Sequence, residues 1–330
     1  MALYQGGDLM AWDEWSRQRQ RPSARWAACS SGVGTAILLL SGLLWWTGAV
    51  SGQEKPQVLP EKRVPCSACF PVEALTTEER SLAEALLLKA LDGEALYTMI
   101  GDLKPMSSGF ASFRVSASEP TSEELSNLET QRRLLSVWTC GEAFYAGLHH
   151  FATVHEGRRY IDAVLVNRPL LRKVLGERVG FFGGFGLTGS AHPLEVLLAV
   201  EYSPQLARLR HYGHLFGYPD HAVDFFVQAA DSQARDGRFV ERDFLRVPTY
   251  RMNEGRSPFV YAVPKGHTPN QADQAIAERA AVILAAYRQR REAWVGEGRP
   301  GIFAMLRDWF DDGKGRCSPA QVMLDQKRKP

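Results

Sequence analysis

Two cysteines in a CxxC arrangement, Cys66 and Cys69, form the sharpest chemical motif in this 330-residue chain. Such a pair can be a redox dithiol, half of a zinc site or a haem attachment point. Phe70 stands where haem attachment requires histidine, and the later cysteines, Cys140 and Cys317, do not form the second pair that zinc usually needs. The pattern therefore favours structural disulfides, either within the pair or with Cys140 and Cys317, and leaves thiol redox activity as an alternative.

One carboxylate and two histidines are candidates for general acid–base catalysis. Glu142, Tyr145 and His149 recur at steps of three and four residues, which predicts one face of a helix that runs towards His150. A carboxylate hydrogen-bonded to an imidazole can transfer protons. His192 is the most plausible partner from elsewhere in the chain, so the candidate catalytic group is Glu142, His149 and His192. The competing interpretation is the polar end of a partly buried helix.

Three further histidines, His211, His214 and His221, lie in one helix-turn-helix segment and are candidate metal ligands. His211 and His214 are three residues apart and therefore lie on adjacent turns of one helix face. His221 could return across the corner at residues 217–219 to complete a site. The spacing matches no established zinc signature. The alternative is a set of surface or core-edge histidines, with Asp220 stabilising the start of its own helix.

A glycine-rich segment, residues 180–189, contains a match to the dinucleotide-binding pattern G-x-G-x-x-G. The context is poor, because no clear parallel-strand unit frames the match and no acidic residue stands at a strand end about twenty residues on. An aromatic, glycine-rich loop is the simpler interpretation, and such a loop can still line or cover a pocket. The candidate ligand-binding residues are Phe181, Gly184, Phe185, Gly186 and Gly189.

Composition and motif content exclude several functional classes. The formal net charge is +2, which gives no electrostatic reason to expect nucleic acid as a partner. The chain contains no G-x-S-x-G elbow, no H-E-x-x-H pair and no Walker loop. The sequence therefore implies no particular cofactor.

The start of the chain predicts a membrane segment. Residues 26–53 carry no charged side chain, and their apolar part, 33–50, approaches the roughly 20 residues that a helical span needs. Arginines precede this run, which places the N-terminus in the cytoplasm and the main domain outside it. A cleaved signal peptide is the alternative. We expect an uncleaved signal anchor at 32–52, after a cytoplasmic segment at 1–31.

The rest of the chain predicts one α+β domain at 76–312, between a Pro-rich linker with the CxxC motif at 53–75 and a polar tail at 313–330. Capping boxes at Thr76 and Thr121 begin two helices, and Thr268 caps a long third one. Strands are expected at 109–117 and 160–166, and a hairpin at 242–252 and 258–264. We expect a small mixed or antiparallel sheet of about four strands covered by helices. Two short stretches, 103–110 and 215–219, look like local signatures, and each predicts a turn before a secondary-structure element.

These patterns together indicate an exported protein tethered by one N-terminal transmembrane helix. We expect a binding or accessory module at the cell envelope, with an envelope protein or a small molecule as its partner. A hydrolase-like envelope enzyme, with or without a metal, and a thiol redox protein are the alternatives.

Overall fold

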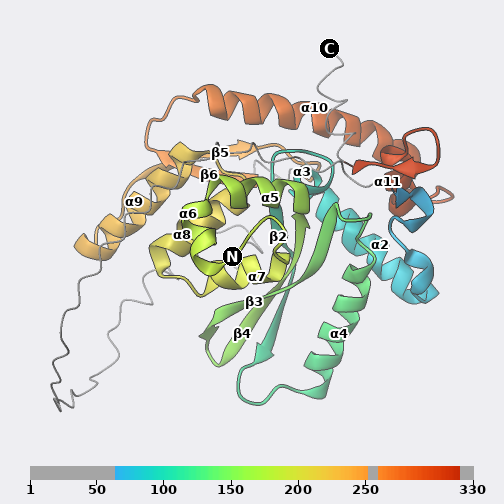
Figure 1. The fold of residues 1–330 in the computed structure, drawn as a ribbon, viewed down its shortest axis with the longest axis horizontal. Helices are drawn as coiled ribbons and strands as arrows, with labels where there is room; N and C mark the ends of the chain where they lie inside the picture. The colour runs from blue at the N-terminus through green and yellow to red at the C-terminus, as the bar shows by residue number, and fades with distance from the viewer. Residues whose placement is uncertain (1–63, 252–258, 320–330) are drawn as a thin grey trace, which may run out of the picture.

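The computed structural model describes residues 64–251 and 259–319 (Figure 1). The predicted cytoplasmic segment 1–31 and membrane segment 32–52 lie outside the described residues, as do the connection 252–258 and residues 320–330. Within the two described ranges, no helix is both long and apolar enough to cross a membrane.

A three-stranded antiparallel sheet lies at the centre of the described chain. Its strands are β2 (Met106–Ser116), β3 (Phe144–His155) and β4 (Arg158–Asn167), and β4 is the middle strand. Side chains alternate along β4 because successive residues of a strand point to opposite faces. Ile161, Ala163 and Leu165 enter one buried cluster, whereas Val164 and Val166 enter another.

Helices cover both faces of this sheet (Figure 1). The face of Leu165 packs in the cluster that includes side chains from α2 (Thr77–Leu91), α3 (Leu96–Met99) and α4 (Ser122–Ser136). The face of Val164 packs against α5 (Arg168–Glu177), α6 (Val179–Phe182), α7 (Pro193–Glu201) and α8 (Gln205–Leu215).

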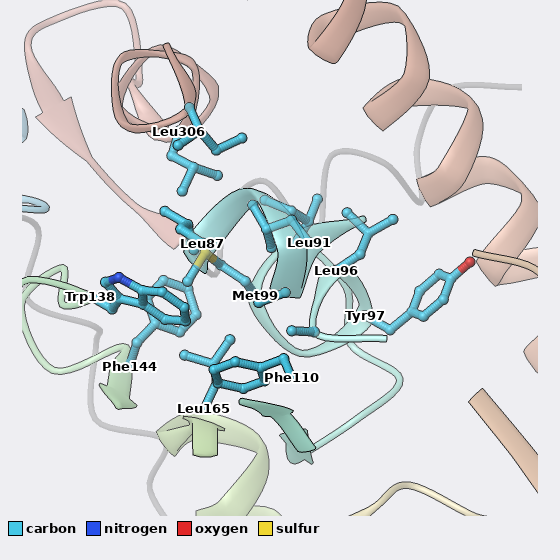
Figure 2. Close-up of a cluster of buried hydrophobic side chains, with 14 of the residues drawn as sticks. Leu87, Leu91, Leu96, Tyr97, Met99, Phe110, Trp138, Phe144, Leu165 and Leu306 are labelled. Atoms are coloured by element: carbon cyan, nitrogen blue, oxygen red, sulfur yellow. The ribbon is translucent and has the colours of Figure 1, made fainter. Parts of the chain in front are cut away.

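The larger of the two clusters is the main core (Figure 2). Trp138 and Phe110 stack within it, with ring centroids 5.5 Å apart. Leu306, from a helix close to the C-terminal end of the described chain, reaches the same cluster as Leu87 of α2. The first and last α-helices of the described chain therefore share one core.

The remaining elements pack around this centre. The antiparallel hairpin β5 (Arg242–Val247) and β6 (Phe259–Pro264) contacts α9 (Asp220–Asp236) and the long α10 (Gln271–Trp294), and α11 (Ile302–Phe310) follows. Three 3₁₀ turns, η2 (Cys66–Ala68), η3 (Val72–Ala74) and η4 (Gly183–Phe185), complete the described helices. A short β1 (Val64–Pro65) pairs with β7 (Arg316–Cys317).

The α+β class is confirmed, and so are both N-terminal capping boxes, at Thr76 and Thr121. The expected sheet of about four strands is instead one three-stranded and two two-stranded antiparallel sheets. The long helix begins at Gln271 and not beside Thr268, because Asn270 accepts hydrogen bonds from two backbone amides of the first turn.

The helix predicted to run towards His150 ends at Ser136, and residues 144–155 form β3. Gly141 has a left-handed φ of 57° and lies within the turn that the Ala143 amide closes onto the Cys140 carbonyl oxygen, just before β3. Residues 145 and 149 are four apart, a spacing that satisfies strand alternation as well as the helical repeat. The predicted shared helix face of Glu142, Tyr145 and His149 is therefore wrong.

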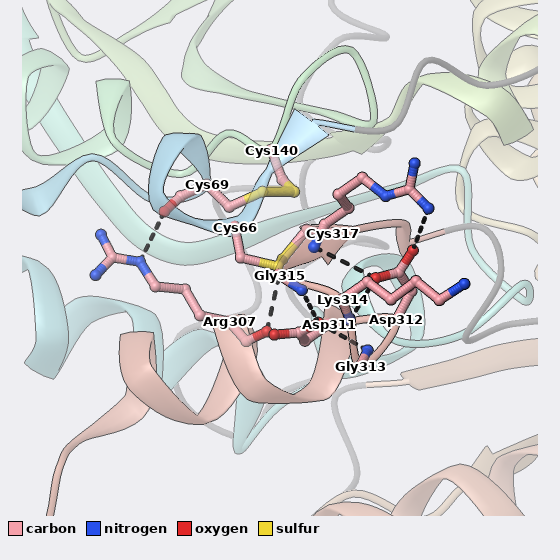
Figure 3. The surroundings of a disulfide bond; sticks show 11 residues. Cys66, Cys69, Cys140, Arg307, Asp311, Asp312, Gly313, Lys314, Gly315 and Cys317 are labelled. Carbon is pink, nitrogen blue, oxygen red and sulfur yellow. Dashed lines mark hydrogen bonds and ion pairs between the residues drawn. A yellow bond between two sulfur atoms is a disulfide. The ribbon is translucent and has the colours of Figure 1, made fainter.

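Two disulfides join the beginning of the described chain to distant segments: Cys66 bonds to Cys317, and Cys69 bonds to Cys140 (Figure 3). The CxxC cysteines therefore bond to other partners and not to each other. Arg307 donates to the carbonyl oxygens of Cys69 and Phe70, so part of the predicted linker is held against α11. Disulfides persist in oxidising compartments, and these two indicate an extracytoplasmic location.

Candidate functional site

Three polar side chains form a row across the three-stranded sheet. Asp162 on β4 stands opposite His149 on β3 and opposite Ser112 on β2. Ser112 Oγ donates a hydrogen bond of 2.6 Å to Asp162 Oδ1. Opposed residues of paired strands share a face, so this polar row lies on the Val164 side, beneath α7 and α8.

Both edge strands are irregular where they pass Asp162. The pairing register shifts between Ser108 and Ser112 on β2, and between His150 and Val154 on β3. The bulge on β3 is bound from the side, because Ala152 donates its backbone amide to Glu201 Oε1 over 2.9 Å. Bulges commonly redirect side chains near functional sites, and here they flank the polar row.

Tyr212 of α8 connects His149 to Glu201 of α7. Its hydroxyl donates to Glu201 Oε2 at 2.7 Å and lies 2.7 Å from His149 Nε2. A tyrosine has only one hydroxyl hydrogen, and Glu201 accepts it, so His149 Nε2 must carry the hydrogen of the second bond. The polar row therefore continues from the sheet into the helices that cover it.

Burial controls the protonation of these groups. It lowers the pKa of His149 to about 3 and raises the pKa of Asp162, so both side chains favour their neutral forms. Burial and then the Glu201 carboxylate raise the pKa of Tyr212. Asp162 Oδ2 is buried and has no hydrogen-bond partner among the described residues. The row could transfer protons, but His149, Asp162 and Glu201 are only 2%, 0% and 3% exposed.

The three candidate catalytic residues, Glu142, His149 and His192, make no contact with one another among the described interactions. Glu142 is exposed and lies 3.4 Å from Arg172. His192 caps α7 by accepting the backbone amide of Leu194, and its ring packs edge-on against Tyr145. His149 lies in the polar row instead.

The aromatic, glycine-rich segment forms two short helical turns, α6 and η4, and not an open loop. Phe182 is fully buried, Phe181 stacks on His211 with centroids 3.5 Å apart, and Phe185 is exposed. A Cβ at Gly184 would meet no atom within 4 Å, whereas Gly186 needs its φ of 71° to end η4. This segment follows a helix and no strand enters it, so the dinucleotide pattern lacks its structural context.

The predicted metal ligands separate into two places. His211 and His214 lie on α8 with ring centroids 6.0 Å apart, and His214 Nδ1 lies 3.5 Å from Asp220. His221 instead contacts Asp273 of α10.

In the described ranges, two groups of three histidine, cysteine or acidic side chains have potential metal-ligand atoms within 4.8 Å of one another. One group is Cys69, Cys140 and Cys317, and the other is His221, His267 and Asp273. The three cysteines all belong to disulfides.

A buried lysine is a feature that sequence reasoning did not identify. Lys104 Nζ lies 3.0 Å from Glu94 Oε2 and 4.1 Å from the centroid of the Phe259 ring. The rings of Phe216 and Tyr218 lie further from the same nitrogen, at 5.3 and 5.5 Å. Burial lowers the pKa of Lys104. The two turn-forming stretches at 103–110 and 215–219 therefore meet at this side chain, although neither indicates the other in the sequence.

The fold and the paired cysteines define a disulfide-stabilised α+β domain of an oxidising compartment. Comparisons with protein-family models, with curated proteins and with solved structures find no match to the chain.

Proposed function

We propose that the chain is a membrane-tethered, extracytoplasmic domain that acts by binding a partner at the cell envelope. The disulfides support the compartment, and the apolar segment at 32–52 supports a single N-terminal tether with its start in the cytoplasm. The observation that supports binding best is that His149, Asp162 and Glu201, the polar groups able to transfer protons, are buried, while an aromatic segment lies on the surface.

The binding surface in this proposal is the α6–η4 segment. Val179 and Phe185 are 65% and 53% exposed, although their neighbour Phe182 is fully buried and anchors the segment. Phe181 is held by its stacking on His211. Exposed aromatic side chains on an anchored segment lose little conformational entropy on binding, and such residues dominate many interfaces. An apolar pocket or groove on an envelope protein is the partner that fits this surface.

The pairing of the CxxC cysteines argues against the thiol redox alternative. A redox dithiol requires its two sulfurs to exchange between thiol and disulfide states with each other. Cys66 and Cys69 instead bond to separate distant cysteines, and Cys69 is fully buried. A structural role for both sulfurs follows from this pairing.

Site-specific photo-crosslinking in intact cells tests the proposal. A benzophenone-bearing phenylalanine analogue replaces Phe185 in the full-length chain, and the matched control carries it at Leu125, which is 48% exposed on α4. We expect one discrete protein adduct from position 185 and none from position 125. The same adducts from both positions, or no protein adduct from 185, would contradict a binding surface at α6–η4, and a small-molecule adduct would redirect the proposal to that ligand class.

A further inference from the structure

Three side chains from separate elements converge at one end of α10. His221 is the second residue of α9, His267 follows β6, and Asp273 lies in the first turn of α10. His221 Nε2 lies 3.2 Å from Asp273 Oδ1, and His267 Nε2 lies 2.8 Å from Asp273 Oδ2. The two imidazole rings are stacked, with centroids 5.3 Å apart. One ligand atom from each of the three residues lies within 4.8 Å of the others.

We propose that His221, His267 and Asp273 form a zinc-binding site. Two imidazoles and one carboxylate are ligands that zinc accepts, and three protein ligands leave a fourth position for water or substrate. This assignment is independent of the α6–η4 surface. It shares His221 with the histidines singled out in the sequence and replaces His211 and His214 with His267 and Asp273.

The geometry is close to what tetrahedral coordination needs. Bonds of about 2.0–2.2 Å to zinc place adjacent ligand atoms roughly 3.3–3.6 Å apart. The 3.2 Å separation of His221 Nε2 from Asp273 Oδ1 already approaches this value. His267 Nε2 contacts the other carboxylate oxygen, Oδ2, at 2.8 Å, so one shared ion requires the carboxylate to bind through both oxygens or to rotate. The three ligand atoms lie within 4.8 Å of one another, so side-chain rotation has to bring the more distant of them closer before all three contact one ion.

His221 supplies a second, independent indication. Its Nε2 atom is buried and has no hydrogen-bond partner among the described residues, because its approach to Asp273 lacks hydrogen-bond geometry. Buried polar atoms are rarely left without a partner, and a bound cation would give this nitrogen one. Zinc binding moves the ring hydrogen to Nδ1 and releases the long 3.3 Å contact with the Asn270 amide.

The carboxylate is held in place by groups outside the ligand set. Tyr261 Oη donates to Asp273 Oδ1 at 2.7 Å, and the Asn270 backbone amide donates to Oδ2 at 2.9 Å. Such outer contacts orient metal ligands. The side chains of His221 and His267 remain 28% and 15% exposed, whereas Asp273 is 2% exposed, so solvent reaches the site from the imidazole side.

Zinc titration of the full-length chain tests the site. The protein is purified in detergent without a polyhistidine tag, stripped with a chelator and titrated with zinc chloride against a competing indicator. His221→Gln and His267→Gln remove one ligand each and leave the cap of α10 intact. His214→Gln is the matched control, because His214 is a buried histidine of α8 outside the group.

We expect one zinc per chain in the wild type and in His214→Gln, with affinity at least about 100-fold weaker in each ligand variant. Absence of stoichiometric zinc in the wild type, unchanged affinity in both ligand variants, or equal loss in His214→Gln would overturn the proposal.

X-ray absorption of the zinc-loaded wild type gives a second measurement that does not depend on the variants folding. It should show nitrogen and oxygen ligands with the scattering of two imidazoles. Sulfur ligands or a single imidazole would contradict this site.

Discussion

The carbonyl oxygen of Leu103 lies against the backbone of Gly217, so closely that a Cβ at residue 217 would come within 2.1 Å of it. Gly217 also has a φ of 72°, a conformation that side chains disfavour. This contact holds the two turn-forming stretches together, and it places Lys104 among the rings of Phe216, Tyr218 and Phe259.

Gly217→Ala should therefore destabilise the fold strongly. The left-handed conformation costs an added side chain about 1–2 kcal/mol, and the backbone clash should bring the total to about 3 kcal/mol or more. Gly237→Ala is the matched control, because Gly237 has a φ of 68° but no atom within 4 Å of an added Cβ. Urea denaturation should show a loss of about 1–2 kcal/mol for the control. Equal losses in the two variants would show that the contact with Leu103 is unimportant.

Lys104→Met should cost about 3–5 kcal/mol, because it leaves the Glu94 carboxyl buried without its partner. Combining it with Glu94→Gln removes both charges and should recover part of that loss. Denaturation of the two variants and of Glu94→Gln alone measures the coupling. Strictly additive losses would mean that the pair is not coupled in the folded protein.

Asp162→Asn and Ser112→Ala, two substitutions in the polar row, should change the stability of the folded protein in different ways. Burial raises the pKa of Asp162, so the folded protein holds this proton above pH 3.8 and loses stability as pH rises through the folded pKa. Asp162→Asn cannot ionise, and its stability relative to the wild type should increase with pH across this window. Ser112→Ala should instead cost about 1–3 kcal/mol, because Asp162 Oδ1 loses its donor. Parallel pH profiles for Asp162→Asn and the wild type would contradict the raised pKa.

Local signals in the sequence predicted most elements but not their assembly. Hydroxyl caps with a glutamate three residues later are properties of a few neighbouring residues, and both such boxes, at Thr76 and Thr121, form as expected. The run after residue 140 was misassigned because a spacing of four residues fits both a helix and a strand. Phe144, Ala146 and Leu148 all pack in one cluster, and their spacing of two residues decides in favour of the strand.

The candidate sites depend on contacts between distant segments, which no local pattern contains. His221 pairs with Asp273, 52 positions later, and Asp162 meets Ser112 and His149 only through strand register. The presence of four cysteines after the apolar segment indicates disulfides, but their positions in the sequence are compatible with several pairings. The fold selects Cys66 with Cys317 and Cys69 with Cys140.

His211 should make stability sensitive to acid. Burial, followed by the neighbouring His214 and Arg210, lowers the pKa of His211 from 6.5 to about 4. Between these values the unfolded chain binds a proton that the folded chain does not, so stability falls as pH drops from 6.5 to 4. The slope from this group is at most about 1.4 kcal/mol per pH unit. Chemical denaturation across this range should give a shallower slope for His211→Gln, and an unchanged slope would exclude His211 as the source.

Disulfide mapping by mass spectrometry tests whether the chain forms a disulfide-stabilised extracytoplasmic domain. The full-length chain is isolated from native membranes with free thiols blocked at lysis, then digested without reduction. We predict linked peptides for Cys66 with Cys317 and for Cys69 with Cys140, and blocking reagent only on Cys29, which precedes the apolar segment. A Cys66–Cys69 linkage, or blocked thiols at these four cysteines, would contradict the account and favour a dithiol or a reducing compartment.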